Sequence, residues 1–127
     1  MAVHHISSSS EFESLLSSTM YVVSDFYADW CGPCKAIAPM YEKMAESASV
    51  QGYLAFAKIN VDNNQDISTK YGVTAMPTFM FFKNGKQVAV NGNALIRGAD
   101  AQALASAAGK LAKLAKEKQD AGVKVGA

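Results

Sequence analysis

The sequence is poor in cysteine and histidine, with two of each in 127 residues. Two cysteines supply only half the ligands of a tetrahedral zinc site, and His4 and His5 are adjacent, so that on a strand they point to opposite faces. No apolar run approaches the roughly eighteen residues of a membrane span. The net charge of +1 gives no general attraction for a polyanion. These shortages argue against a metal centre, a membrane partner and a nucleic-acid partner.

The N-terminal residues lack the features of a targeting segment. They have no apolar core of the kind found in signal peptides, and the only arginine of the chain is Arg97, whereas transit peptides are rich in arginine. We therefore expect a cytoplasmic, reducing environment, in which cysteines are not kept as a purely structural disulfide. The two cysteines need a chemical explanation.

Positive charge is concentrated near the C-terminus, where five lysines between Lys110 and Lys124 are opposed only by Glu117 and Asp120. We interpret them as the solvated face of a helix followed by a flexible tail, rather than as a membrane or nucleic-acid patch. The chain is predicted to form one domain, residues 1–118, with a C-terminal tail, residues 119–127.

Hydrophobic patterning predicts strands and helices in alternation. Strands rich in β-branched and aromatic residues are expected at 20–28, 53–61, 78–83 and 87–90, the last two joined by an Asn-Gly turn. Helices are expected to begin at Ser8 or Ser10, at Pro33, near Gln65 and after Asp100. With one further strand ahead of the first helix, the predicted order is β-α-β-α-β-α-β-β-α, which indicates an α/β fold with a mixed sheet.

Cys31 and Cys34 are separated by Gly32 and Pro33, at the point where a buried strand gives way to a helix. Backbone N–H groups and the helix dipole favour an anion at a helix start, which lowers the pKa of the Cys31 thiol and raises its thiolate fraction. Cys34, one turn into the helix, is expected to keep its proton until it is needed. The pair is therefore predicted to exchange disulfides in two steps, with attack by Cys31 and resolution by Cys34.

Two alternatives explain the cysteine pair less well. A structural disulfide across so short a loop constrains the unfolded chain by roughly 2 kcal/mol at most, which makes it the weakest such crosslink. A metal site lacks ligands beyond the two adjacent histidines. The position of the pair after a strand and before a helix favours redox chemistry.

Two charged residues interrupt the apolar strands, Asp25 in the first and Lys58 in the second. A buried carboxylate is costly unless it has a partner or a task, and burial raises its pKa toward the range that is useful for proton transfer. Asp25 is therefore either a proton acceptor or the partner of Lys58 in a structural ion pair.

The segment from Asp25 to Lys35, DFYADWCGPCK, resembles the active-site segment of thioredoxins. Further similarities follow in order, within about residues 4–118: Pro39, Lys58 in AKINVD, Tyr71-Gly72-Val73, Met76-Pro77-Thr78 and the segment from Phe82 to Gly85. The resemblance implies the thioredoxin fold, an α/β fold in which a central mixed five-stranded sheet is flanked by four helices. In that fold the cysteine pair lies at the tip of the second helix.

The resemblance also implies roles for the residues of the site. Cys31 and Cys34 are expected to form the redox-active disulfide. Asp25, supported by Lys58, is expected to accept the proton of Cys34 as the mixed disulfide resolves. Catalysis would then rest on Cys31, Cys34 and Asp25, with no metal.

A second group of residues is implied to contact the substrate. Pro77 is expected to be a cis-proline that faces the disulfide and leaves the backbone of Met76 free to pair with an extended substrate segment. Trp30 is expected to shield the site, the alternative being a core residue. The remaining members of this group are Gly32, Pro33 and Gly98.

The implied function is that of a general protein-disulfide reductase with no bound cofactor, which an NADPH-dependent thioredoxin reductase recycles. The clients implied by the family are peroxiredoxins, methionine sulfoxide reductases and ribonucleotide reductase, and the chain is expected to act as a monomer. One alternative is a disulfide oxidase or isomerase, whose members usually carry His between the cysteines. Another is an interaction or chaperone module, whose members tend to lose a cysteine or the buried Asp.

The chain departs from short thioredoxins by about five extra residues before Gly98. We expect Asn91–Ile96 to form a surface excursion at the far edge of the sheet, away from Cys31. The reason is that its Asn-Gly-Asn segment is typical of turns and has few residues to bury.

Overall fold

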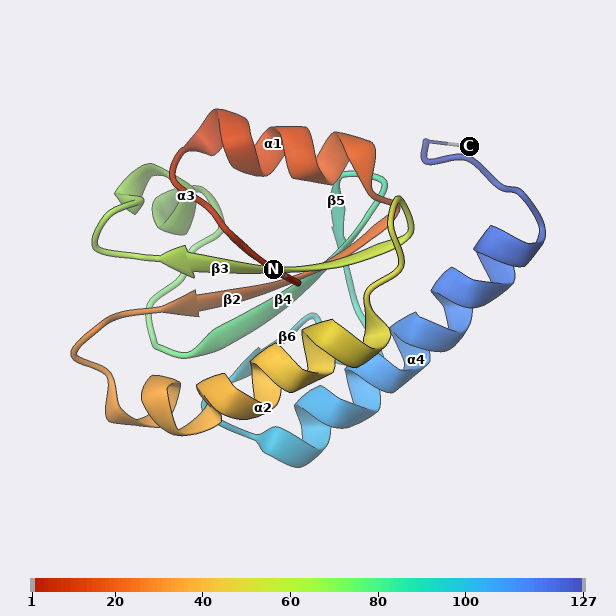
Figure 1. Ribbon diagram of the computed structural model, residues 1–127. Coiled ribbons are helices and arrows are strands. Elements are labelled where there is room, and N and C mark those ends of the chain that lie inside the picture. The colour runs from red at the N-terminus through yellow and green to blue at the C-terminus, as the bar shows by residue number, and fades with distance from the viewer. Residues whose placement is uncertain (1, 127) are drawn as a thin grey trace.

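Three mainly apolar strands form the centre of the sheet in the computed structural model, which describes residues 2–126 (Figure 1). They are β2 (Tyr21–Tyr27), β3 (Leu54–Asn60) and β4 (Thr78–Lys83). β2 runs parallel to β3 and antiparallel to β4. Because β2 is paired on both edges and covered on both faces, nearly every residue in it is buried.

Shorter strands complete the sheet at its two edges. β1 (Val3–His5) pairs in parallel with β3, while β5 (Lys86–Val88) and β6 (Leu95–Arg97) both pair antiparallel with β4. The strand order is β1-β3-β2-β4-β5, with β6 next to β4. The predicted mixed sheet is confirmed, and its fifth position is shared by two short strands, of which the sequence patterning predicted one.

Four helices flank this sheet within the described residues, as predicted: α1 (Ser9–Ser18), α2 (Gly32–Ala48), α3 (Gln65–Lys70) and α4 (Ala101–Asp120). Ser8 caps α1 by accepting the Glu11 N–H at 3.2 Å, and Asp100 caps α4 by accepting the Ala103 N–H at 3.0 Å. Figure 1 shows α2 and α4 together on one side of the sheet and α1 on the other. None of the described helices is long and apolar enough to cross a membrane.

The alternation of side chains along β2 divides the core into two clusters. Val23 belongs to the cluster beneath α2 and α4, whereas Val22 and Phe26 belong to the cluster beneath α1 and α3. Asp25 therefore lies on the α2 face of the sheet. By the same rule Lys58, two residues after Phe56 of the α2 cluster, lies on that face as well.

The extra residues before Gly98 leave the edge of the sheet after β5, and the chain returns to β4 at β6 with the pairing register along β4 unbroken. Two neighbouring residues of β4, Phe81 and Met80, pair with Val88 and Leu95. Residues 89–94 therefore form an inserted excursion between β5 and β6.

The predicted boundaries of this excursion, Asn91–Ile96, are wrong by two residues at each end. Ile96 pairs with Phe79 and is buried, so that it belongs to the core and not to the surface. Val90, inside the excursion, is buried as well and pairs with Asn93 across a small bridge. Tertiary pairing with β4, which local patterning does not report, sets these limits.

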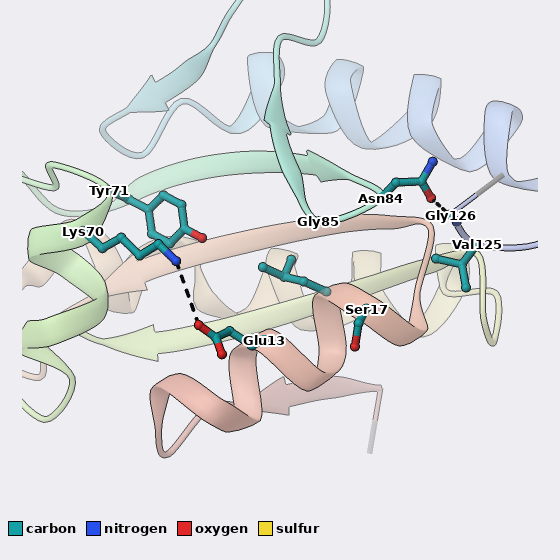
Figure 2. Close-up of a pocket in the computed structure, with 9 residues that line it drawn as sticks. Glu13, Ser17, Lys70, Tyr71, Asn84, Gly85, Val125 and Gly126 are labelled. Carbon is teal, nitrogen blue, oxygen red and sulfur yellow. Dashed lines mark hydrogen bonds and ion pairs between the residues drawn. The ribbon is translucent and has the colours of Figure 1, made fainter.

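Beyond α4 the chain turns back toward the sheet. The helix continues to Asp120, past the boundary predicted at residue 118. The Gly126 N–H donates to Asn84 Oδ1 at 2.8 Å, at the turn between β4 and β5, as Figure 2 shows. Val125 and Gly126 help to line a pocket of about 350 Å³ that also reaches α1 and α3. The flexibility of residues 119–127 stays a prediction.

Candidate active site

Cys31 lies at the junction between β2 and α2 and is the N-cap residue of the helix. Its Sγ accepts the Cys34 N–H at 3.2 Å, and its own N–H donates to the Ala28 carbonyl at 3.2 Å. Pro33 occupies the first turn of α2, where its missing N–H costs no hydrogen bond. The helix therefore begins directly after Cys31, and the Cys31 sulfur lies next to backbone N–H groups of the first turn that have no partner within the helix.

Cys31 and Cys34 form a disulfide, with their Cα atoms 5.3 Å apart. When the pair is reduced, the N–H groups at the helix start face the Cys31 sulfur and favour its thiolate. Cys34 lies one turn further on and is buried in the same apolar cluster as Cys31, but within the described residues its sulfur accepts no N–H at the helix start. The geometry thus gives the two sulfurs unequal surroundings.

Asp25 is fully buried, and within residues 2–126 neither of its carboxylate oxygens has a hydrogen-bond partner. Burial raises the pKa of Asp25 from 3.8 to about 7, against the opposing effect of the Lys58 charge, which lowers it. The neighbouring Ser24 hydroxyl is also buried without a partner in the described residues. A carboxyl group with this pKa can both bind and release a proton near neutral pH.

Lys58 is the β3 residue in register with Asp25, but it does not form an ion pair with it. The ion pairs within the described residues are Lys70–Glu13 and Lys116–Asp120. The Lys58 Nζ lies instead 4.5 Å from the centroid of the Tyr27 ring, a cation–π contact. The side-chain positions thus do not support the structural ion pair that the sequence left open.

A cavity of about 190 Å³ lies between Lys58 and Cys34. Cys34, Lys58 and Tyr27 all line it, together with Lys35 at the start of α2. The cavity is polar on the lysine side and large enough for water. It offers a path by which a proton reaches or leaves the neighbourhood of Cys34.

Tyr41 fixes α2 to the sheet beside these groups, and the sequence analysis assigned it no role in the site. Its fully buried hydroxyl lies 3.0 Å from the Val23 carbonyl and 2.8 Å from the Ala57 carbonyl, to which it can donate. These carbonyls precede Asp25 and Lys58 in β2 and β3. Tyr41 therefore holds the helix that carries the cysteines against the strands that carry the two charges.

Trp30 is exposed, with 68% of its surface accessible, and this excludes the alternative of a core residue. Its indole N–H donates to Asp62 Oδ2 at 3.0 Å, which orients the ring next to the cysteines. The sequence analysis missed Asp62. It could have been found, because Trp30 and Asp62 follow the paired residues Tyr27 and Asn60, and the carboxyl ends of parallel strands share one edge of a sheet.

Pro77 and Gly98 lie together at the start of β4. The Met76–Pro77 peptide bond is cis, and the Gly98 N–H donates to the Pro77 carbonyl at 2.8 Å. Gly98 has a φ of +90°, which favours glycine. The excursion thus leaves Gly98 beside Pro77, although no hydrogen bond within residues 2–126 joins this pair to the cysteines.

The part of the chain that the structure describes contains no group of three or more His, Cys, Asp or Glu side chains that could hold a metal ion.

The chain is similar to thioredoxins in both sequence and structure. The thioredoxin family model matches residues 3–110. A thioredoxin of Neurospora crassa is 63% identical over 116 residues, which cover 91% of this chain and 91% of that protein. The crystal structure of Malassezia sympodialis thioredoxin matches with a TM-score of 0.77 at 38% identity, over 87% of this chain and 93% of that one. A chain from a structure of the thiol resolving mechanism in yeast mitochondrial 1-Cys peroxiredoxin via glutathione/thioredoxin systems has a TM-score of 0.73 at 32% identity, over 85% of this chain and 94% of that one.

Proposed function

The chain belongs to the thioredoxin family and is a dithiol–disulfide reductase, and we propose the roles of the individual residues in this activity. Cys31 is the attacking thiolate, Cys34 the resolving thiol and Asp25 the proton acceptor. The observation that carries this assignment is the combination of two features. A disulfide lies at the N-cap of α2, and a fully buried carboxyl group without a hydrogen-bond partner in the described residues lies on the face of the sheet that α2 covers.

The reaction balances over two exchange steps. The Cys31 thiolate attacks one sulfur of the substrate disulfide, forming a mixed disulfide and releasing the other substrate sulfur as a thiolate. Cys34 transfers its proton to the Asp25 carboxylate, and the resulting thiolate attacks the Cys31 sulfur. The second substrate thiolate leaves, the Cys31–Cys34 disulfide forms, and two electrons have passed to the substrate.

Substrate is bound next to the cysteines by residues from three segments. Trp30, Gly32 and Pro33 border the disulfide on one side, and they are all exposed. Met76, Pro77 and Gly98 form the other side, where the backbone of Met76 pairs with an extended segment of the client. Support for this arrangement comes from the hydrogen bond that keeps Gly98 at Pro77.

The electrons come from NADPH through a thioredoxin reductase, and no cofactor is bound to the chain itself. The proposed clients are peroxiredoxins, methionine sulfoxide reductases and ribonucleotide reductase. The chain is proposed to act on them as a monomer in the cytoplasm. Similarity to a chain from the structure concerning peroxiredoxin thiol resolution supports the first of these clients. Fractionation of the cells that make the protein tests the compartment, with a mitochondrial location as the contrary result.

An insulin-reduction assay with dithiothreitol tests the proposed function. We expect the wild-type chain to accelerate insulin precipitation and, with a purified thioredoxin reductase, to support NADPH oxidation. An interaction module would give neither result. An oxidase would reoxidise reduced ribonuclease faster than it reduces insulin.

Lys58→Met is expected to raise the pKa of Asp25 above about 7, because the Lys58 charge is the group that lowers it. The carboxyl carbon resonance of Asp25, followed by NMR as a function of pH, measures the shift. Lys35→Met is the matched control, since Lys35 lines the same cavity but does not shift Asp25. An unchanged pKa in Lys58→Met would contradict the proposed support of Asp25 by Lys58.

Deletion of residues 89–94 is expected to change the rate of insulin reduction by less than about twofold, because surface excursions tolerate shortening. The deletion joins Val88 to Leu95 and lets the edge strand continue along β4 in register. The side chain of Asn91 donates to Ser106 Oγ on α4 and to no residue of the proposed site. A much larger loss, in a variant with an unchanged circular dichroism spectrum, would assign the excursion to client recognition.

A further inference from the structure

The proposed disulfide exchange uses neither the excursion at residues 89–94 nor the lysine-rich helix α4. They meet at one groove of about 290 Å³, between the edge of the sheet and the C-terminal half of α4. None of the residues that line this groove belongs to the cysteine site. Its volume lies near the lower end of the range for small-molecule sites.

The floor of the groove is apolar. Val88 and Val90 line it from β5 and the excursion, Leu111 and Leu114 from α4, and Tyr21 from the start of β2. Val88 and Leu114 are only partly buried, so that apolar surface is open to solvent here. Binding of a hydrocarbon chain would remove this surface from water.

Three lysines border the apolar floor: Lys83, Lys110 and Lys118. On α4, Lys110 and Lys118 lie on the same stripe as the two leucines, one at each end and about 12 Å apart along the helix axis. The Lys83 Nζ lies 5.8 Å from the centroid of the Tyr21 ring. The groove therefore joins a hydrocarbon surface to a rim of ammonium groups.

The charge of the groove is uncompensated within the described residues. Among residues 2–126 no carboxylate side chain lines it, and the two ion pairs of this part of the chain involve neither Lys83, Lys110 nor Lys118. The pocket in Figure 2 differs in this respect, because its lysine, Lys70, is paired with Glu13 at 3.9 Å. The groove against α4 thus combines apolar walls with three lysines that form no ion pair within the described residues.

We propose that this groove binds a small single-chain amphiphile with an anionic head, of the medium-chain carboxylate class. The chain lies along the valine and leucine side chains, and the carboxylate is held by the lysine ammonium groups. The lysine charges favour an anionic head group, and the apolar floor favours a hydrocarbon tail. A short anion lacks the tail and an uncharged chain lacks the head group, so each makes only one of the two interactions.

Titration with decanoate, below its micelle concentration and followed by amide NMR shifts of the labelled oxidised protein, tests this site. Saturable shifts are expected at residues 88–91 and 110–118. Decanol, with the same chain and no charge, and acetate, with the charge and no chain, are expected to bind at least about fivefold more weakly. The double variant Lys110→Gln/Lys118→Gln is expected to weaken decanoate binding by about fivefold.

The matched control is Lys113→Gln/Lys116→Gln, which removes the same net charge from α4 at positions that do not line the groove. It is expected to change decanoate affinity by less than about twofold. Equal weakening by both double variants, or equal binding of decanol and decanoate, would overturn the proposal. So would shifts of the same residues that depend on protein concentration and not on decanoate, since these would assign the groove to a second copy of the chain.

Discussion

Replacing Cys31 with serine is expected to reduce insulin reduction to the background rate of dithiothreitol alone. The hydroxyl group of serine is not ionised at neutral pH and forms no mixed disulfide, so that the first exchange step is lost. The fold should survive, because serine is itself a preferred N-cap and can accept the Cys34 N–H that the Cys31 sulfur accepts now. Loss of activity with an unchanged far-ultraviolet spectrum is the expected result.

Cys34→Ser is the matched variant, since it removes one sulfur from the same turn but keeps the attacking thiolate. It is expected to accumulate mixed disulfides with client proteins, visible on non-reducing gels and removed by dithiothreitol. Cys31→Ser is expected to accumulate none.

In the reduced wild-type chain, iodoacetamide should modify Cys31 much faster than Cys34, because the thiolate is the reactive species. Equal rates at the two sulfurs would contradict the assignment of attacker and resolver.

Local sequence patterns were sufficient for the centre of the fold. The continuous apolar run around β2 and the change to a helical repeat after Pro33 are both local, and they place the cysteine pair at a strand–helix junction without any tertiary information. The buried Asp25 could be predicted for the same reason, since a charge inside such a run has no route to solvent. These features define most of the proposed catalytic group.

What could not be predicted depends on pairing between distant segments. Leu95 and Ile96 became a strand because β4 offers them free backbone groups, while their own sequence neighbours resemble a turn. The position of the Lys58 ammonium group over Tyr27, instead of against Asp25, depends on where two side chains of neighbouring strands find space. The groove against α4 arises only when the excursion and the last helix are brought together.

Asp25 is expected to destabilise the oxidised fold at neutral pH, and its removal should separate stability from activity. Its pKa is about 7 in the folded protein, against 3.8 for the ordinary group, so that the folded state holds its proton more tightly than the unfolded state. Whatever stability this protonated group provides is fully present below pH 3.8, the pKa of the ordinary group, and is lost as the pH rises from there through about 7. Above that pH the wild-type fold contains a buried carboxylate that has no hydrogen-bond partner among residues 2–126.

Asp25→Ala, and Asp25→Asn as its isosteric control, should therefore be more stable than the wild-type chain by roughly 1–4 kcal/mol at pH 8. This advantage should shrink toward pH 4, where the wild-type carboxyl group is protonated in the fold, and urea unfolding of the oxidised proteins at both pH values measures it. The same variants should reduce insulin more slowly, most visibly near pH 7, because the Cys34 thiol then loses its proton without a nearby acceptor. The two effects have one cause, since the burial that makes the carboxylate costly is also what gives it a pKa suited to taking the proton. Variants that are less stable than the wild-type chain and equally fast would make Asp25 a structural partner of Lys58, and the Cys34 proton would then leave through water in the cavity beside it.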